Sequence, residues 1–504
     1  MRKSGILMHI TSLPGNYGIG TMGKSAFDFV DFLEKSGQQS WQILPLTPTG
    51  YGDSPYQSNS AYAGNPYLID LDLLIEEGLL KREEVESRDW CWSEDRVDFG
   101  LQYNNKLAVL RLAYARFEGG VEFDAFLAEQ DEWLPDFALF MALKGENNSA
   151  AWYTWEEGLK RRRAPALKAA RKRLADEIRF YTFVQYIFYK QWDALHSYAH
   201  SKGIDIIGDV PIYVPYDSVE VWCDYKLFQL DNDRTPTAVA GCPPDAFSED
   251  GQLWGNPLYK WEKMKTDNYA WWVKRMGAAS KLYDVIRLDH FRGFDEYWSV
   301  PYGDKTAKGG EWKRGPKIDF VNALKNQLKG VKFIAEDLGT LNKAVLDLRD
   351  ESGYPGMKVL GFASDGCKEN EYLPHNYPRN SICYTGTHDN MTTLQWLHTA
   401  SYEALEFLVE YMGLEDVAAH MTQKQMVWAI IRMAMASMAD ECIVPMQDYL
   451  TIGEEGRMNF PGTMTTNNWT WRASKGFDSD ELAQRIAAMT ERYGRAPAKA
   501  EDTK

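Results

Sequence analysis

The chain has 504 residues, 44% of them hydrophobic, so it can bury a large core and exceeds the usual size of one compact domain. Its formal net charge of −16 argues against binding to phosphate backbones, because that binding depends on Lys and Arg. The six cysteines form no CxxC pair and lie near no histidines of zinc-ligand spacing, so we expect reduced thiols and a cytoplasmic protein.

Short runs rich in Val, Ile and Leu recur along the chain and suit strands that are buried on both faces. The first run, residues 5–10, is too short for a secretory signal and contains His9, so it is predicted to be a strand. The other runs begin at residues 41, 204, 284, 331, 356, 381 and 442. Helical periodicity between them favours parallel strands joined by right-handed crossovers. Eight such strands predict an α/β fold, a (β/α)8 TIM barrel.

The spacing of these runs is uneven. Roughly 160 residues separate the second run from the third, although a βα unit needs only about 30. Residues 167–203 show apolar residues at three- and four-residue spacing before a glycine, which is typical of a helix. The predicted organisation is therefore a catalytic barrel over 1–74 and 200–480, a mostly α-helical insertion over 75–199, a long loop region over the cleft at 210–282, and a frayed polar tail at 481–504.

Membrane insertion is not expected. The most apolar helical stretch, residues 426–439, is interrupted by Arg432. It is also shorter than the roughly 20 residues that span a bilayer.

Acidic residues end several of the predicted strands. They are Asp209, Asp289, Glu336 (with Asp337 next to it), Asp389 and Asp448. The carboxyl ends of barrel strands meet at one face, where enzymes of this architecture have their active sites. One such acid alone would be read as a helix cap or surface ion pair, but five together favour a site. Crowding raises the pKa of some of them, as glycoside chemistry needs when one carboxyl donates a proton while another stays ionised.

A metal site is the competing interpretation of these acids. Clustered carboxylates and histidines on a barrel rim also bind divalent cations in hydrolases. The chain lacks the HxH and HExxH spacings. We therefore expect no metal at this face.

Two loops rich in Gly and Pro carry aromatic residues, at 50–67 and 251–261. Aromatic rings stack on the apolar faces of sugars, and Asn, Gln, Ser and Asp side chains hydrogen-bond to hydroxyls. Tyr56 and Trp254 are thus candidates for sugar contacts. Tryptophans within strand or helix patterns are expected in the core instead, namely Trp41, Trp155 and Trp192.

Three short motifs carry a resemblance to a known family: RLDHFRGF (287–294), AEDLG (335–339) and TGTHDN (385–390). In these the chain closely resembles the 4-α-glucanotransferases called amylomaltases or disproportionating enzymes, which belong to the α-amylase clan. Longer matches begin at residues 4, 50, 208, 243 and 459, so the resemblance runs from residue 4 to about residue 472. An ordered series of this length is hard to obtain by chance.

The resemblance implies the roles of individual residues. It makes Asp289 the nucleophile, Glu336 the general acid/base and Asp389 the stabiliser of the transition state. Arg287 is implied to orient the nucleophile, and Trp254 to lie on a loop that covers the intermediate and favours a sugar acceptor over water. The full set of implied substrate-binding residues is Tyr51, Ser54, Tyr56, Asp209, Gln252, Trp254, Arg287, His388 and Asn459.

The implied reaction is retaining transfer of an α-1,4-glucan segment to the 4-hydroxyl of an acceptor, through a covalent intermediate on Asp289. Maltooligosaccharides, starch or glycogen chains would be donors and acceptors, with glucose as a further acceptor. No cofactor, nucleic acid or membrane partner is implied. Two alternatives stay open at this point: a hydrolase that ends the same chemistry with water, and a catalytically silent barrel that binds glucans.

Overall fold

A computed structural model describes residues 2–50, 52–244, 248–339, 341–363 and 365–498. Eight parallel strands close into a barrel in the order β1-β12-β11-β10-β9-β6-β3-β2. These strands are β1 (Lys3–Leu7), β2 (Ser40–Gln42), β3 (Asp205–Val210), β6 (Val285–Leu288), β9 (Lys332–Ala335), β10 (Gly356–Val359), β11 (Ser381–Tyr384) and β12 (Glu441–Pro445). Each predicted apolar run supplies one strand, so the predicted (β/α)8 barrel is confirmed.

The strands are apolar throughout because both of their faces are covered. In β6, β10, β11 and β12 every residue is buried, as expected for a parallel sheet enclosed by helices. The tryptophans predicted to be buried are in the core, at 0% exposed for Trp41, 5% for Trp155 and 0% for Trp192.

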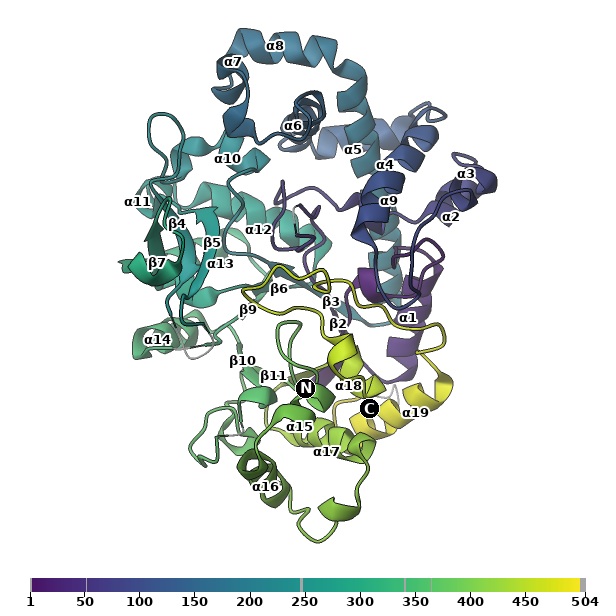
Figure 1. The fold of residues 1–504 in the computed structure, drawn as a ribbon, viewed down its shortest axis with the longest axis vertical. Coiled ribbons are helices and arrows are strands. Elements are labelled where there is room, and N and C mark those ends of the chain that lie inside the picture. Colours follow the sequence, from purple (N-terminus) through teal and green to yellow (C-terminus); the bar gives the residue numbers. More distant parts are fainter. Residues whose placement is uncertain (1, 51, 245–247, 340, 364, 499–504) are drawn as a thin grey trace.

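Helices fill the interval between β2 and β3. They are α2 (Leu71–Glu76), α3 (Arg82–Glu86), α4 (Phe99–Tyr114), α5 (Val121–Glu129), α6 (Leu134–Glu146), α7 (Glu157–Lys160), α8 (Ala164–Arg173) and α9 (Ala175–Ser201). In Figure 1, α6, α7 and α8 gather at the end of the molecule opposite α15 (Thr393–Thr399), α16 (Tyr402–Tyr411) and α17 (Gln423–Ala436). Helix α9 is shared: Phe183 near its start packs on Tyr114 of α4, whereas Tyr198 near its end packs on Phe27 of α1 (Lys24–Lys35). It therefore connects the inserted helices to the barrel.

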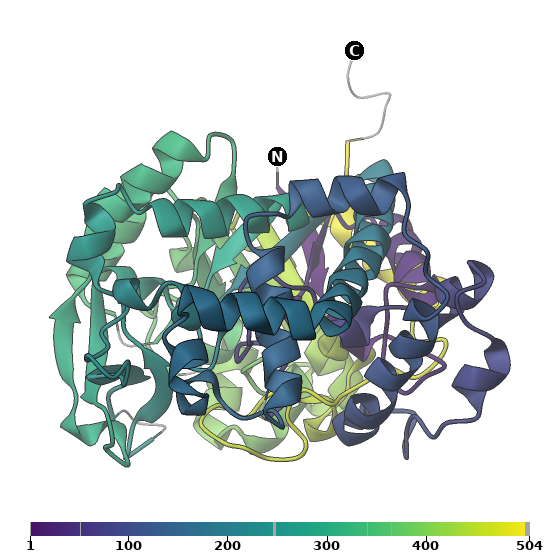
Figure 2. The same cartoon turned by 90° about the horizontal axis from the view of Figure 1, so that it is seen from above.

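The region 210–282, predicted to be a long loop, is largely regular structure. It contains α10 (Val219–Cys223), β4 (Ala238–Cys242), β5 (Gln252–Pro257), α11 (Trp261–Lys265) and α12 (Ala270–Leu282). Strands β4 and β5 join β7 (Glu296–Pro301) and β8 (Glu311–Arg314) in an antiparallel sheet of order β5-β4-β7-β8. In Figures 1 and 2 this sheet and helices α2 and α3 lie on opposite sides of the barrel. The loop expectation fails because β4 pairs with β7, a partner distant in the sequence.

The remaining helices follow the later strands. They are α13 (Lys317–Gln327), α14 (Lys343–Ser352), α15 (Thr393–Thr399), α16 (Tyr402–Tyr411), α17 (Gln423–Ala436), α18 (Met446–Leu450) and α19 (Asp480–Arg492). Within the described ranges, none of the helices is long and apolar enough to cross a bilayer.

The prediction of a frayed C-terminal tail is wrong through Arg495. Ser479 caps α19, and Ile486 on its inner face is fully buried. The fully buried Arg495 then donates hydrogen bonds to the carbonyl oxygens of Lys3, Met435 and Ala439. The polar composition conceals an amphipathic helix whose end is held by buried hydrogen bonds.

Candidate active site

The register of the barrel strands brings the acidic residues to one level. Asp209 pairs with Arg287 between β3 and β6, and Leu288 pairs with Ala335 between β6 and β9. The ladder continues one residue beyond the strands, because the backbone N–H of Asp289 donates to Val210 and that of Glu336 donates to Leu288, each at 3.1 Å. Asp289 and Glu336 therefore leave adjacent strands at the carboxyl end of the barrel.

Arg287 is a buried cation between two carboxylates. Its Nη1 donates to Asp209 Oδ2 at 2.6 Å and to Asp289 Oδ1 at 2.9 Å. The Arg287 side chain is 4% exposed and that of Asp209 is fully buried, whereas that of Asp289 is 28% exposed. Charge-assisted hydrogen bonds of this kind fix orientation as well as charge. Arg287 thus holds one oxygen of Asp289 inside the barrel and leaves the rest of the carboxylate toward the mouth.

Glu336 is held by backbone donors. Its Oε2 accepts from the N–H of His290 at 2.6 Å and its Oε1 from the N–H of Leu338 at 3.0 Å. His290 has a left-handed backbone (φ 50°), a conformation that costs of order 1–3 kcal/mol in a non-glycine residue and recurs at functional sites. This turn follows Asp289 directly and aims the His290 N–H at Glu336.

Burial shifts the titration of both acids. It raises the pKa of Glu336 above the usual glutamate range, Arg287 opposes the shift, and the neighbouring charge of Asp289 adds to it. Burial also raises the pKa of Asp289, again opposed by Arg287, with which it hydrogen-bonds directly. Two neighbouring carboxyl groups that interact in this way favour a state with one proton between them.

Asp389 stands at the other side of the mouth, after β11. Asn459 donates from Nδ2 to Asp389 Oδ1 at 2.7 Å, and His388 Nε2 lies 3.5 Å from Asp389 Oδ2. The Asp389 side chain is 45% exposed, so it faces solvent rather than the core.

Tyr56 connects the two sides of the site. Its hydroxyl donates to Asp209 Oδ2 at 2.8 Å and lies 3.0 Å from His388 Nε2. The Tyr56 and His388 rings stack, with centroids 5.3 Å apart and planes 21° apart. Burial lowers the pKa of His388, which favours the neutral ring. The polar contacts therefore run without a break from Arg287 through Asp209, Tyr56 and His388 to Asp389.

The two aromatic loops border this network. Trp254 on β5 sets its ring edge-on to His290, with centroids 4.9 Å apart, and its Nε1 donates to Gln252 Oε1 at 3.2 Å. Ser54 Oγ accepts from the N–H of Tyr56 at 3.2 Å. The implied sugar-contact residues thus lie near the acids, except for Tyr51, which lies outside the described residues.

Asp448 does not share the site, although it ends the eighth strand run. It lies on α18, is 1% exposed, and accepts hydrogen bonds from the hydroxyls of Thr385 and Thr393 and the N–H of Thr393. These bonds fasten the segment after β11 to β12. The expectation that the strand-end acids all face one mouth is therefore wrong for Asp448, whose carboxylate bonds to two threonine hydroxyls and one backbone N–H. It is also wrong for Asp337, which is 1% exposed and accepts from the N–H of Met357 at 2.7 Å.

Two residues near the site carry no clear sequence signal. The ring of Trp469 lies 5.7 Å from that of Tyr56 and 5.9 Å from that of His388. Arg457 donates from Nη2 to the backbone oxygen of Asp389 at 3.2 Å. Both come from the irregular segment after β12, where neither period nor spacing marks a site.

With the fold and the mouth described, known proteins provide a direct comparison. Residues 8–478 match the family model described as 4-alpha-glucanotransferase. The chain belongs to the 4-alpha-glucanotransferase family. The resemblance found in the motifs at 287–294, 335–339 and 385–390 is thereby confirmed.

Individual relatives of this family match along their whole length. The 4-alpha-glucanotransferase of Clostridium butyricum is 46% identical over 492 residues, covering 97% of this chain and 100% of that protein. That of Thermus thermophilus is 44% identical over 498 residues, covering 97% and 98%.

Solved structures of family members agree with the fold. The amylomaltase from Streptococcus agalactiae in complex with acarbose has a TM-score of 0.95 at 40% identity, covering 99% of this chain and 100% of that one. The amylomaltase from Corynebacterium glutamicum shares the fold, with a TM-score of 0.80 at 18% identity, covering 97% and 75%.

Proposed function

We propose that the protein transfers a segment of an α-1,4-glucan from a donor to the 4-hydroxyl of an acceptor glucose or glucan, with retention at the anomeric carbon. Membership of the 4-alpha-glucanotransferase family supports the reaction class. The observation that carries the mechanism is the pairing of Asp289, held by Arg287, with the buried Glu336 on the adjacent strand. A retaining glycosidase mechanism needs one ionised and one protonated carboxyl.

In the first step Asp289 attacks the anomeric carbon. Arg287 occupies Oδ1, so Oδ2 is the oxygen oriented for attack. As the Asp289 ester bond forms, Glu336 gives its proton to the glycosidic oxygen, and the leaving chain departs with a free 4-hydroxyl. The Arg287 charge favours ionised Asp289, and the burial that raises the pKa of Glu336 favours its protonated form.

In the second step an acceptor replaces the leaving chain. Glu336 takes the proton from the acceptor 4-hydroxyl, whose oxygen attacks the anomeric carbon and releases Asp289. Asp389, oriented by Asn459 through Oδ1, presents Oδ2 to sugar hydroxyls and stabilises the positive charge that develops in each transition state. Tyr56 and Asp209 hold the ring at the cleaved position.

A strand that covers the glycosyl-enzyme intermediate favours transfer to a sugar over hydrolysis by water. Trp254 packs against His290, which adjoins Asp289. A strand that lies over the intermediate keeps water away from the anomeric carbon. A sugar acceptor can still bind there, because it makes its own contacts with the protein. We propose that the β5 segment with Gln252 and Trp254 has this role.

Three further proposals concern the substrates, the cellular compartment and the domain boundaries of the protein. We propose α-1,4-glucans, namely maltooligosaccharides or chains of starch or glycogen, as donors and acceptors in carbohydrate metabolism. All six cysteines are thiols in the structure, which supports a reducing compartment, the cytoplasm. We also propose residues 75–199 as a helical subdomain inserted into a catalytic barrel formed by 1–74 and 200–480.

Incubation with maltotriose alone tests the reaction class. We expect glucose together with a ladder of longer oligomers, without net gain of reducing ends. Only shorter products with rising reducing ends would indicate a hydrolase, and unchanged trimer would indicate a binding protein; either result contradicts the proposal. Asp289→Asn serves as the inactive control, because the amide cannot form the ester.

A further inference from the structure

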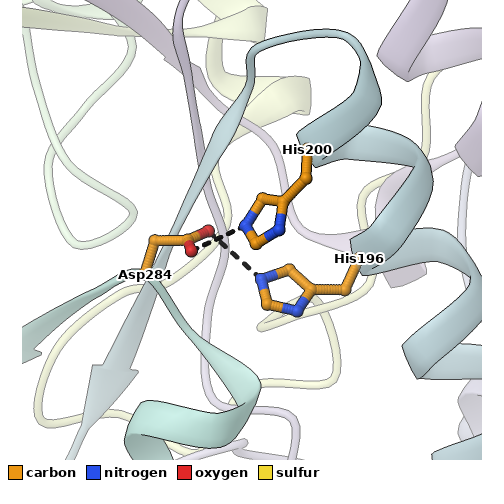
Figure 3. Close-up of side chains that lie close together, drawn as sticks. All are labelled: His196, His200 and Asp284. Atoms are coloured by element: carbon orange, nitrogen blue, oxygen red, sulfur yellow. Dashed lines mark hydrogen bonds and ion pairs between the residues drawn. The ribbon is translucent and has the colours of Figure 1, made fainter.

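A cluster of two histidines and one aspartate lies at the amino-terminal end of the barrel strands, opposite the mouth that holds the acids. His196 and His200 are on α9, one helical turn apart, and Asp284 immediately precedes β6 (Figure 3). Asp289 follows the carboxyl end of the same strand. Five residues of extended chain span about 16 Å, so this cluster is separate from the catalytic mouth.

The three side chains converge. Asp284 Oδ1 lies 2.7 Å from His200 Nε2, and Asp284 Oδ2 lies 3.1 Å from His196 Nε2. Each residue offers one ligand atom, and these three atoms all lie within 4.8 Å of one another. Figure 3 shows both rings turned toward the carboxylate from the same face of α9. Histidines at i and i+4 on a helix are a recurrent pair of metal ligands.

The cluster is also supported from outside. Asp284 Oδ2 accepts from the N–H of Ile206 at 2.8 Å, and the ring of His196 stacks on Trp192, with centroids 5.8 Å and planes 14° apart. Such contacts orient ligands in metal sites. The side chain of His200 is 48% exposed, which leaves an entry path from solvent and room for movement.

We propose that His196, His200 and Asp284 bind one divalent first-row transition ion, with solvent completing the coordination. Two imidazoles and one carboxylate suit Zn²⁺, Co²⁺ or Ni²⁺, whereas Mg²⁺ and Ca²⁺ prefer oxygen ligands. Bonds of about 2.0–2.2 Å place tetrahedral ligand atoms about 3.3–3.6 Å apart. The Asp284–His200 and Asp284–His196 contacts, at 2.7 Å and 3.1 Å, are shorter than this, and all three ligand atoms lie within 4.8 Å of one another. Side-chain shifts of about 1 Å or less would therefore form the site.

The ion would join the last turn of α9 to the base of β6. Because α9 also carries the contacts to the inserted helices, the site would stabilise the attachment of the insertion to the barrel. It takes no part in glycosyl transfer. This inference does not depend on the proposed function.

Metal titration of the chelator-treated protein tests the site. With Zn²⁺ in a calorimeter we expect one ion per chain. With Co²⁺ we expect visible d–d absorption without the near-ultraviolet thiolate band that binding to cysteines would give. His200→Ala should weaken binding more than about tenfold, and His420→Ala, which changes an exposed histidine elsewhere, should leave it unchanged.

Three results would overturn the proposal: no stoichiometric binding, binding unchanged in His200→Ala, or a thiolate band in the Co²⁺ spectrum. Far-ultraviolet circular dichroism and thermal unfolding of the metal-free protein check the fold of each variant. Asp284→Asn is less useful than His200→Ala, because Asp284 also accepts from the backbone of Ile206. If His200→Ala does not fold, His196→Asn is the second variant that tests the site.

Discussion

At the scale of single residues, the proposed mechanism depends on side chains that orient the acids at the barrel mouth. Asn459 is the clearest example, because its amide donates to Asp389 Oδ1 at 2.7 Å. A hydrogen bond to a charged group is worth about 1.5–3 kcal/mol. Asn459→Ala should therefore lower kcat/KM for maltooligosaccharides by about 10- to 100-fold.

The effect should appear without loss of fold. Asn380→Ala, which removes an exposed amide that bonds to the backbone of Gly353, is the matched control and should keep full activity. If Asn459→Ala retains wild-type kcat/KM, Asn459 does not position Asp389 for catalysis.

The pH dependence of transfer follows from the raised pKa values of Asp289 and Glu336. Burial raises the pKa of Glu336, so its protonated, active form persists to higher pH than an ordinary glutamate would allow. Burial raises the pKa of Asp289 as well, and activity should fall on the acid side as this nucleophile becomes protonated. We expect a bell-shaped profile of kcat/KM whose limbs both lie above ordinary carboxyl pKa values.

The assignment of the basic limb can be checked separately. An α-maltosyl fluoride donor needs no proton on its leaving group, so Glu336→Gln should still form the glycosyl-enzyme from it. If this variant keeps the basic limb of the wild-type enzyme, a group other than Glu336 is the acid.

At the scale of elements, the barrel was predictable and the pieces around it were less so. Strands such as β11 and β12 are buried on both faces, so their sequences are continuous apolar runs with a clear signal. The β4–β7 pairing joins segments separated by β5, a helix pair and a barrel strand, and no local pattern marks it. Asp448 shows the same limit within the site, since its position at a strand end does not reveal that its carboxylate bonds to Thr385 and Thr393.

The C-terminal element provides a stability prediction. Arg495 is fully buried and donates to four backbone carbonyls, that of Lys3 and three within residues 435–439. Arg495→Met would leave these acceptors unsatisfied, and we expect a loss of about 3–5 kcal/mol in the free energy of unfolding, measured in urea. Arg492→Met, which changes an exposed arginine at the end of α19, should change stability by less than about 0.5 kcal/mol.

At the scale of the whole molecule, one barrel gathers the side chains of the candidate site from far apart in the chain. Tyr56 comes from the segment after β2, Asp209 from β3, Asp389 from the segment after β11 and Asn459 from beyond β12, yet direct contacts connect them through His388. The sequence could place Asp289 and Glu336 because strand ends in a barrel share one face. It could not place Arg457 or Trp469, whose positions depend on how an irregular segment crosses the mouth.

The central claim is that Asp289 carries the glycosyl group between donor and acceptor. Treating Glu336→Gln with an activated fluorosugar such as 5-fluoro-α-glucosyl fluoride should trap this intermediate, and peptide mass spectrometry should find one added fluoroglucosyl group on the peptide that contains Asp289. The group should be absent from the Asp289→Asn, Glu336→Gln double variant. A label on another residue would contradict the account.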